Sequence, residues 1–259
     1  HEIIGKSSVK TTHDDKAGVA AGVVAAFQNC LRENNIDPKD VIFVAHSTTQ
    51  ATNALIEGDV AKVGVVGVGP KGIGGVIAKA QTNMKDINLG SGRFIRLKNR
   101  YICDEKLSDQ AVTDTIKSLV GDGAEVIVAS ESFGVDDMEN ETGICKIAKD
   151  MGLEATAASE ITKLYGLTRR TRTAAINASI LPKMLNTANS TEQSVKSAGV
   201  EVPLMIMRGD GGVMEISEMK KRPVLTMLSG PAASVMGSLM YLRASNGVYF
   251  EVGGTTTNI

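Results

Sequence analysis

A turn able to bind an anion is the first chemistry that the sequence suggests. An apolar strand runs into two glycines and three threonines, Gly253, Gly254, Thr255, Thr256 and Thr257. Successive glycines let several backbone N–H groups point at one anion, and threonine hydroxyls add donors for phosphate oxygens. On the strand itself, Glu251 supplies a carboxylate able to hold Mg²⁺ or its waters. The competing interpretation is a plain β-hairpin turned by Gly-Gly, which this segment alone slightly favours.

Three further polar clusters lie where predicted strands end or helices begin. Ser229 and Gly230 open a helix with small residues, which lets a helix N-terminus approach a ligand closely. Asp210 and Gly211 follow a predicted strand, and α/β proteins bind ligands at such strand ends. The third cluster follows another strand and consists of His46, Ser47, Thr48, Thr49, Thr52 and Asn53. A single histidine is more often structural, but four hydroxyl neighbours favour a site.

Two other motifs have weaker claims to chemistry. The segment Gly67–Gly72 matches G-x-G-x-x-G, but Pro70 removes a backbone N–H where pyrophosphate needs donors, and no second strand with an acidic end follows. We interpret it as a strand-to-helix turn. The segment Thr168–Arg172 is an anion contact or, more commonly, a set of exposed helix arginines. The basic residues between Arg93 and Arg100 are read as a solvated face.

The elements that position these residues alternate between short apolar strands and longer helices. The expected strands are Val41–Ala45, Lys62–Gly67, Glu125–Ala129, Pro203–Met207 and Val248–Val252. The expected helices are Ala17–Asn35, Gln50–Glu57 with a Ser or Thr cap, Ser108–Val120 capped by Ser108, Asp137–Met151, Thr168–Asn186 and Ala232–Ala244. The polar stretch Gln81–Cys103 is predicted to be a connecting loop or a short hairpin. This alternation indicates an α/β sheet that is at least partly parallel.

Composition limits the classes of protein that fit. The 259 residues include 42% hydrophobic and 22% charged residues, typical of a globular chain with one large or two small domains. A net charge of −1, 3% aromatic residues and no Trp argue against a nucleic-acid platform. No apolar run reaches the roughly 18–20 residues of a membrane span, and no signal peptide opens the chain. We therefore expect a cytoplasmic protein without nucleic-acid or membrane partners.

The positions of the cysteines and histidines indicate neither a disulfide framework nor a zinc site. The three cysteines, Cys30, Cys103 and Cys145, stand far apart and predict reduced, mostly buried thiols rather than a disulfide framework. The three histidines are equally scattered, so no zinc-ligand spacing appears.

Five ordered blocks resemble the hydantoinase A / 5-oxoprolinase family. His46–Leu55 is similar to the family's HGTT-x-ATNAL block. The other blocks are Thr11–Asp15 (similar to TTPDD), Leu204–Met214 (MQSNGG-x-M), Arg222–Ala233 (RPV-x-T-x-LSGPA) and Phe250–Ile259 (FDMGGTSTDV). Together they extend over most of the chain, which makes the resemblance specific.

The resemblance implies an actin-like ATPase fold, in which two RNase H-like lobes clamp ATP between paired turns. For this chain it implies an α/β, RNase H-like lobe with a mixed, partly parallel sheet flanked by helices and incomplete at both ends. Residues 1–245 would form the first lobe without its N-terminal phosphate hairpin. Residues 246–259 would form the first strand and phosphate turn of the second lobe. We accordingly expect no appreciable ATP hydrolysis by these 259 residues alone.

The activity implied is ATP-driven opening of cyclic amides such as hydantoins or 5-oxoproline, through phosphorylation of a ring carbonyl. ATP and Mg²⁺ are the implied cofactors. Gly253–Thr257, Ser229 and Gly230 would bind the nucleotide, and Glu251 the metal. The substrate-binding candidates are His46, Thr48, Thr49, Asn53, Asp210 and Gly211. The implied partners are a B-type subunit or further copies of the chain.

Departures from the family pattern keep two alternatives open. Ser47 replaces a Gly of the family pattern, Glu251 an Asp before the phosphate turn, and Asn258 an Asp after it. Glu251 keeps the charge with a longer reach, whereas Asn258 loses a carboxylate. The alternatives are another actin-like phosphotransferase, of the sugar or acid kinase type, and a non-catalytic nucleotide-binding or regulatory subunit.

Overall fold

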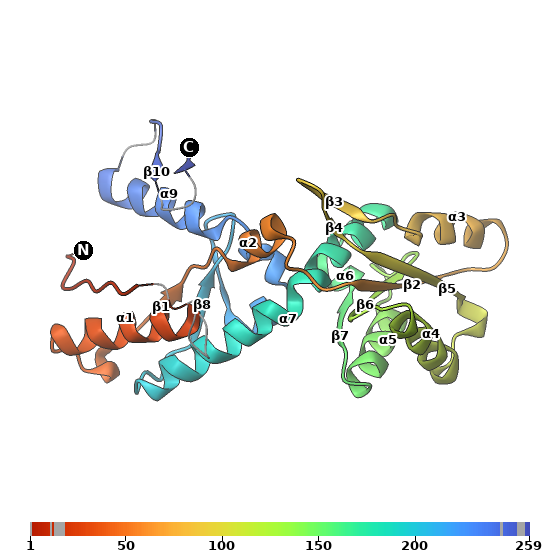
Figure 1. Ribbon diagram of the computed structural model, residues 1–259, viewed down its shortest axis with the longest axis horizontal. Helices are drawn as coiled ribbons and strands as arrows, with labels where there is room; N and C mark the ends of the chain where they lie inside the picture. Colours follow the sequence, from red (N-terminus) through yellow and green to blue (C-terminus); the bar gives the residue numbers. More distant parts are fainter. Residues whose placement is uncertain (1, 11, 13–18, 244–245, 253–256) are drawn as a thin grey trace. The chain divides into compact units, whose positions relative to one another are not determined.

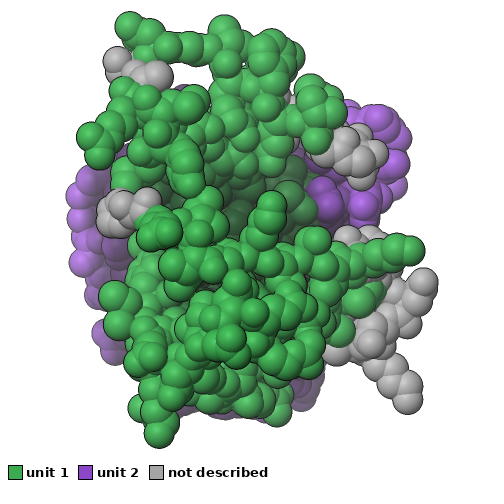
Figure 2. All heavy atoms as spheres, turned by 90° about the vertical axis from the view of Figure 1, so that its left-hand side faces the viewer, with its two compact units in different colours: residues 1–52, 183–259 green, residues 53–182 purple. Residues whose placement is uncertain are grey.

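The chain forms two compact units (Figure 2). The structure, a computed structural model, describes residues 2–10, 12, 19–243, 246–252 and 257–259. Unit 1 comprises residues 1–52 and 183–259, and unit 2 comprises residues 53–182. Helices α2 (Gln50–Glu57) and α7 (Leu167–Ser197) carry the chain from one unit to the other. The predicted division into residues 1–245 and 246–259 stays a prediction.

Unit 2 is built on a parallel four-stranded sheet with strand order β5-β2-β6-β7. The strands are β2 (Val63–Gly69), β5 (Leu97–Cys103), β6 (Val126–Glu131) and β7 (Glu154–Ala157). Val63 lies opposite Leu97 on one side and Val126 on the other. Every residue of β2 is buried, as expected of a central parallel strand with helices on both faces (Figure 1).

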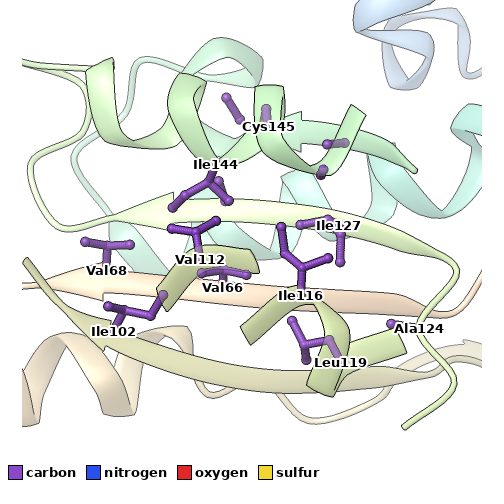
Figure 3. Close-up of a cluster of buried hydrophobic side chains, with 14 residues drawn as sticks. Val66, Val68, Ile102, Val112, Ile116, Leu119, Ala124, Ile127, Ile144 and Cys145 are labelled. Atoms are coloured by element: carbon purple, nitrogen blue, oxygen red, sulfur yellow. The ribbon is translucent and has the colours of Figure 1, made fainter. Parts of the chain in front are cut away.

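The core of unit 2 lies between one face of this sheet and helices α4 (Asp109–Gly121) and α5 (Glu139–Asp150) (Figure 3). Ser108 caps α4 as predicted, because its hydroxyl accepts a hydrogen bond from the Ala111 N–H. The buried side chains of this layer include Val66, Val68, Ile116, Leu119 and Ile144. Burying an aliphatic side chain of this size contributes about 1.5–3 kcal/mol, so this layer is a main support of the unit.

Helix α3 (Ile73–Thr82) covers the opposite face, where two glycines of β2 let it pack closely. A Cβ atom added to Gly67 would collide with the side chain of Thr82. One added to Gly69 would lie 2.9 Å from the Cβ atom of Ala78. The glycines of the G-x-G-x-x-G match thus serve helix–sheet packing, in agreement with the predicted strand-to-helix turn.

The two edge strands of this sheet were not predicted. The stretch Gln81–Cys103 contains the expected hairpin, β3 (Ile87–Gly90) with β4 (Arg93–Ile95), but it continues into β5. Strand β7 was missed at the other edge. Strand β5 pairs on one side only and is partly exposed, so it needs no continuous apolar run. Strand β7 is mostly buried, but it has only four residues and contains no large apolar side chain. Arg96 nearby forms an exposed ion pair with Asp86 (2.7 Å), which agrees with the predicted solvated face.

Arg170 on α7 is fully buried, which corrects the expectation of an exposed helix arginine. Its guanidinium donates to the carbonyl oxygens of Leu164 (2.8 Å) and Glu131 (2.5 Å). Glu141, also fully buried, accepts hydrogen bonds from the backbone N–H groups of Glu131 (2.8 Å) and Ser159 (2.7 Å). Ser159 lies in the short helix α6 (Ala158–Ile161). Arg170 and Glu141 therefore hold the carboxyl end of β6 in place.

Unit 1 contains a three-stranded sheet with strand order β1-β8-β9. Strand β1 (Val44–His46) is parallel to β8 (Leu204–Met207), and β9 (Val213–Glu215) is antiparallel to β8. The remaining elements are α1 (Val19–Glu33), α8 (Ile216–Lys221), α9 (Ser229–Leu242) and the hairpin of β10 (Glu251–Val252) with β11 (Thr257–Asn258). Short 3-10 turns lie at Pro38–Asp40 and Pro223–Thr226 in this unit, and at Asp104–Lys106 in unit 2.

The α/β class with a partly parallel sheet and flanking helices is confirmed, with three corrections. The expected strands lie in three sheets rather than one. Strand β1 begins at Val44 rather than Val41, and Ile42 is 89% exposed. The strand predicted at Val248–Val252 is reduced to β10, which pairs with β11 and with no other described strand. Among the described helices, none is long and apolar enough to cross a membrane.

Candidate functional site

The carboxyl ends of β1 and β8 lie side by side in unit 1, because the two strands are parallel and His46 pairs with Ile206. His46 ends β1 and leads into Ser47–Thr49. Strand β8 ends at Met207 and leads into the turn formed by residues 208–212. Ligands of α/β proteins bind at such edges. Two of the predicted polar clusters are therefore brought together.

Thr48 joins this edge to the starts of two helices. Its hydroxyl accepts a hydrogen bond from the Gln50 N–H (3.2 Å) and so begins α2, as predicted. Its carbonyl oxygen accepts a hydrogen bond from the Ser229 hydroxyl (3.0 Å) at the start of α9. A second link runs from the Leu228 N–H to the hydroxyl of Thr52 (3.1 Å). The third predicted cluster, at Ser229 and Gly230, thus lies beside the first.

Gly230 lies very close to Thr49. A Cβ atom added to Gly230 would be 3.2 Å from Thr49 Cγ2 and 3.9 Å from Ser47 Oγ. The preceding residue, Leu228, has a left-handed backbone (φ 59°), which turns the chain sharply into the helix. The N–H of Ala232 bonds to the Leu228 carbonyl, whereas those of Ser229 and Gly230 form no hydrogen bond to a described residue. The start of α9 therefore has two backbone donors without a described partner, of which that of Ser229 is buried, together with the positive end of its dipole.

The turn between β8 and β9 is held by its own hydrogen bonds. The Asp210 carboxylate accepts from the Gly212 N–H (3.0 Å) and pairs with the Arg208 guanidinium (2.5 Å), and Gly211 adopts a positive φ of 85°. The N–H of Gly209 donates to the Leu225 carbonyl (2.8 Å), and a Cβ atom at Gly209 would collide with the Met227 carbonyl. The turn consequently packs against the segment that leads into α9.

His46 is half-buried, and this burial lowers the pKa of its imidazole below the ordinary value. The ring is therefore neutral at pH 7 and keeps one acceptor and one donor nitrogen. Asn53 is exposed on α2 and is the first residue of unit 2. Its proposed role, like those of Asp210 and Gly211, stays a prediction.

Glu251 contacts α9. Its Oε1 accepts a hydrogen bond from the Ser234 hydroxyl (3.2 Å). Glu251 lies in β10, which pairs with β11 to form the hairpin of the competing interpretation. Thr257, in β11, is exposed. Four residues of the predicted phosphate turn, Gly253, Gly254, Thr255 and Thr256, lie outside the described residues. A hairpin and a phosphate turn are compatible, because the turn itself would carry the donors.

Two residues that support this site were not selected from the sequence. Thr52 was noted as a polar neighbour, but its bond to Leu228 depends on a contact between distant segments. Ser234 lies five residues after Ser229, and no sequence signal distinguishes it from other helix serines.

Two protein-family models match this chain. A model described as the hydantoinase/oxoprolinase N-terminal region matches residues 1–152, and one described as hydantoinase/oxoprolinase matches residues 170–259. The chain belongs to the hydantoinase/oxoprolinase family. A relative of this family member, the uncharacterized protein MJ0964 of Methanocaldococcus jannaschii, is 24% identical over 178 residues, covering 63% of this chain and 26% of that protein.

Two solved structures share the fold of this hydantoinase/oxoprolinase-family chain. The first is an acetone carboxylase, in a nucleotide-free structure on ATP-dependent acetone carboxylation; its TM-score is 0.70 at 17% identity. The match covers 94% of this chain and 39% of that one. The second is the ATP-dependent caprolactamase of Pseudomonas jessenii, with a TM-score of 0.63 at 19% identity, covering 91% and 36%. The chain thus spans well under half the length of each and shares the fold of the part that it covers.

The residues present fit a nucleotide that brings its own metal ion. No three His, Cys, Asp or Glu side chains gather as a metal site in the part of the chain that the structure describes. Mg²⁺ commonly keeps several waters and takes one or two carboxylates together with phosphate oxygens, rather than a cage built only of protein. Glu251 is the predicted carboxylate for such an ion, and Ser229 and Gly230 are the predicted phosphate donors; both roles stay predictions.

Proposed function

We propose that this chain is part of an ATP-dependent hydrolase that opens cyclic amides of the hydantoin or 5-oxoproline type. Membership of the hydantoinase/oxoprolinase family supports this proposal. So does the shared fold with an ATP-dependent caprolactamase, an enzyme named for a cyclic amide. The reaction would transfer a phosphoryl group to the ring carbonyl oxygen, which makes the carbonyl carbon open to attack by water.

The observation that carries the proposal is the junction of Thr48–Thr49 with Ser229–Gly230. One hydrogen bond holds the start of α9 at the carboxyl ends of β1 and β8. The missing side chain at Gly230 leaves room for close approach to Thr49. A helix N-terminus and hydroxyl-bearing strand ends so combined suit a phosphate group and a small polar molecule bound side by side.

Each candidate residue has a role in this proposal. ATP supplies the phosphoryl group, and Mg²⁺ neutralises its charge. The N–H groups of Ser229, Gly230 and the Gly253–Thr257 turn would hold the phosphates, and Glu251 would hold the ion. The neutral ring of His46 and the Thr49 hydroxyl would bind the cyclic amide, because both can donate and accept hydrogen bonds. The other proposed substrate contacts are Thr48, Asn53, Asp210 and Gly211.

The family membership and the structural likenesses also suggest partners and rival activities. A B-type subunit or further copies of the chain would complete the enzyme. The acetone carboxylase likeness adds a rival: activation of a ketone or bicarbonate by the same phosphoryl chemistry. Another phosphotransferase and a non-catalytic regulatory subunit stay as further rivals.

A substrate panel tests the proposal. The complete gene product, alone and with a B-type subunit, would be incubated with Mg-ATP and hydantoin, 5-oxoproline, caprolactam, acetone with bicarbonate, or a sugar. Phosphate release that rises with a cyclic amide, together with the ring-opened product, is the expected result. Turnover with only acetone or a sugar would transfer the chain to a rival activity, and nucleotide binding without turnover would favour a regulatory role.

A further inference from the structure

A small cavity of about 70 Å³ lies in unit 1, lined by residues of α1, β1, α7 and β8. Most of its wall is aliphatic or aromatic. Its polar members are His46, Thr191 and Ser194. Sites for small organic ligands usually measure about 300–1,000 Å³, so this cavity is too small for the substrate.

The Thr191 side chain has an unmet need for a hydrogen bond. Thr191 is 2% exposed, and its hydroxyl is buried without a bond to any described residue. Other hydroxyls of α7 behave differently: those of Ser194 and Ser197 donate to the carbonyls of Ser190 (2.7 Å) and Gln193 (2.8 Å). A buried hydroxyl without a partner loses its hydrogen bonds to water and gains none in return, so a partner inside the cavity is strongly favoured.

His46 is a second polar group of the wall without a hydrogen bond to a described residue. No charged side chain from α1, β1, α7 or β8 is among the described residues of that wall, and His46 is its only titratable group. Burial lowers the pKa of this imidazole, so its ring is neutral inside an apolar enclosure.

We infer that the cavity binds a water molecule that bridges the Thr191 hydroxyl and one ring nitrogen of His46. A water needs about 10–15 Å³ of such space and two to four polar partners. The cavity offers the space, and Thr191, His46 and the free lone pair of the Ser194 hydroxyl are the partners. The Ser194 hydroxyl already donates to Ser190, so it can only accept from the water, and the Thr191 O–H needs the water oxygen as its acceptor. The second proton of the water then points at His46, which makes that ring nitrogen an acceptor and fixes the tautomer. Thr191 is therefore a positioning residue.

The consequence for chemistry rests on the proposed function. When the water is bound to one ring nitrogen, the other ring nitrogen, at the carboxyl end of β1, has one fixed protonation state. A substrate carbonyl or ring N–H would then meet a nitrogen that does not exchange between the donor and the acceptor form. The bound water and the fixed tautomer themselves do not depend on which reaction the protein catalyses.

Nuclear magnetic resonance on the full chain tests the inference. In the wild type we expect cross-peaks between long-lived water and the Thr191 methyl group, and a single neutral tautomer for His46 in ring ¹⁵N spectra. In T191V, which keeps the shape but loses the hydroxyl, the cross-peaks disappear, both tautomers are populated, and the pKa of His46 falls further. T191S keeps the wild-type tautomer. The matched control S197A removes a hydroxyl of the same helix that donates to Gln193 and does not line the cavity, and it leaves the tautomer unchanged.

Two results would overturn the inference: no water cross-peaks at Thr191 in the wild type, or an unchanged His46 tautomer in T191V. The first measurement needs no variant, so it decides the matter even if T191V does not fold. A failed substrate panel with intact water cross-peaks would count against the proposed function alone.

Discussion

The Ser229 hydroxyl donates to the carbonyl oxygen of Thr48 at 3.0 Å, across 181 positions of sequence. This bond ties the start of α9 to the loop that follows β1. Ser229 is buried, so its hydroxyl has no ready access to water as a substitute. The position of the backbone N–H groups of Ser229 and Gly230 depends on this bond.

We expect Ser229→Ala to lower the free energy of unfolding by about 0.5–1.5 kcal/mol, the usual net value of one hydrogen bond. Urea unfolding followed by a probe in unit 1 measures this change. Ser238→Ala on the same helix is the control, because the Ser238 side chain has no hydrogen bond to a described residue. Equal effects of the two substitutions would show that the Thr48 bond does not stabilise the start of α9.

Gly230→Val should lower ATP-dependent turnover by about 100-fold or more, comparable with the loss of a catalytic backbone donor. The Cβ atom added at position 230 would lie 3.2 Å from Thr49 Cγ2, and the two methyl groups of the valine would crowd the end of β1 further. Steady-state kinetics with varied Mg-ATP check this. The control is Gly237→Ala, since a Cβ atom at Gly237 meets nothing within 4 Å. Full activity of Gly230→Val would exclude close approach of a ligand to this helix start.

Glu251→Gln removes the charge but keeps an oxygen for the Ser234 hydroxyl. If Glu251 holds Mg²⁺, the Mg²⁺ concentration for half-maximal turnover should rise by about 10–100-fold. Glu251→Asp, which restores the residue of the family pattern, should stay closer to the wild type. The measurement is a Mg²⁺ titration at saturating ATP, and identical curves for all three proteins would remove Glu251 from the metal site.

Arg170→Met should destabilise unit 2 by about 3–5 kcal/mol, because it breaks a buried charged network beside Glu141. Arg169→Met, at an exposed position next to it, should stay within about 0.5 kcal/mol of the wild type. Thermal and urea unfolding compare the two. A small effect at Arg170 would mean that the carbonyls of Leu164 and Glu131 find other donors.

We expect the carboxyl group of Glu131 to make the free energy of unfolding depend on pH. Burial raises the pKa of its carboxyl group, against the hydrogen bond from Asn140 (2.8 Å). The folded state therefore binds this proton more tightly than the unfolded state, and the stabilisation is complete below about pH 4 and is lost as the pH rises through the raised value. Glu131→Gln keeps an acceptor for Asn140 without titrating. Its stability relative to the wild type should increase between about pH 4 and pH 7 in urea unfolding series. A constant difference over that range would contradict the raised pKa.

Much of the fold could be predicted because local patterns carry it. Helix α2 has the predicted bounds Gln50–Glu57, and α4 differs by one residue at each end. The central strands β2 and β6 were found from their continuous apolar runs. The edge strands β5 and β7 were missed, since β5 is partly exposed and the four-residue β7 contains no large apolar side chain. Helix α7 was predicted to end at Asn186 but continues to Ser197, supported by buried side chains such as Ala188 and Val195.

The sequence by itself determined which residues could do chemistry: the hydroxyl, glycine and carboxylate clusters and the order of the family blocks. Those are properties of residue type and spacing, which need no coordinates. Only the tertiary structure decided that Thr48 meets Ser229, that Arg170 is buried rather than exposed, and that Thr191 faces a cavity shared with His46. These contacts join segments far apart in the chain. Their energies come from burial and from hydrogen bonds that exist only once strands and helices have packed together.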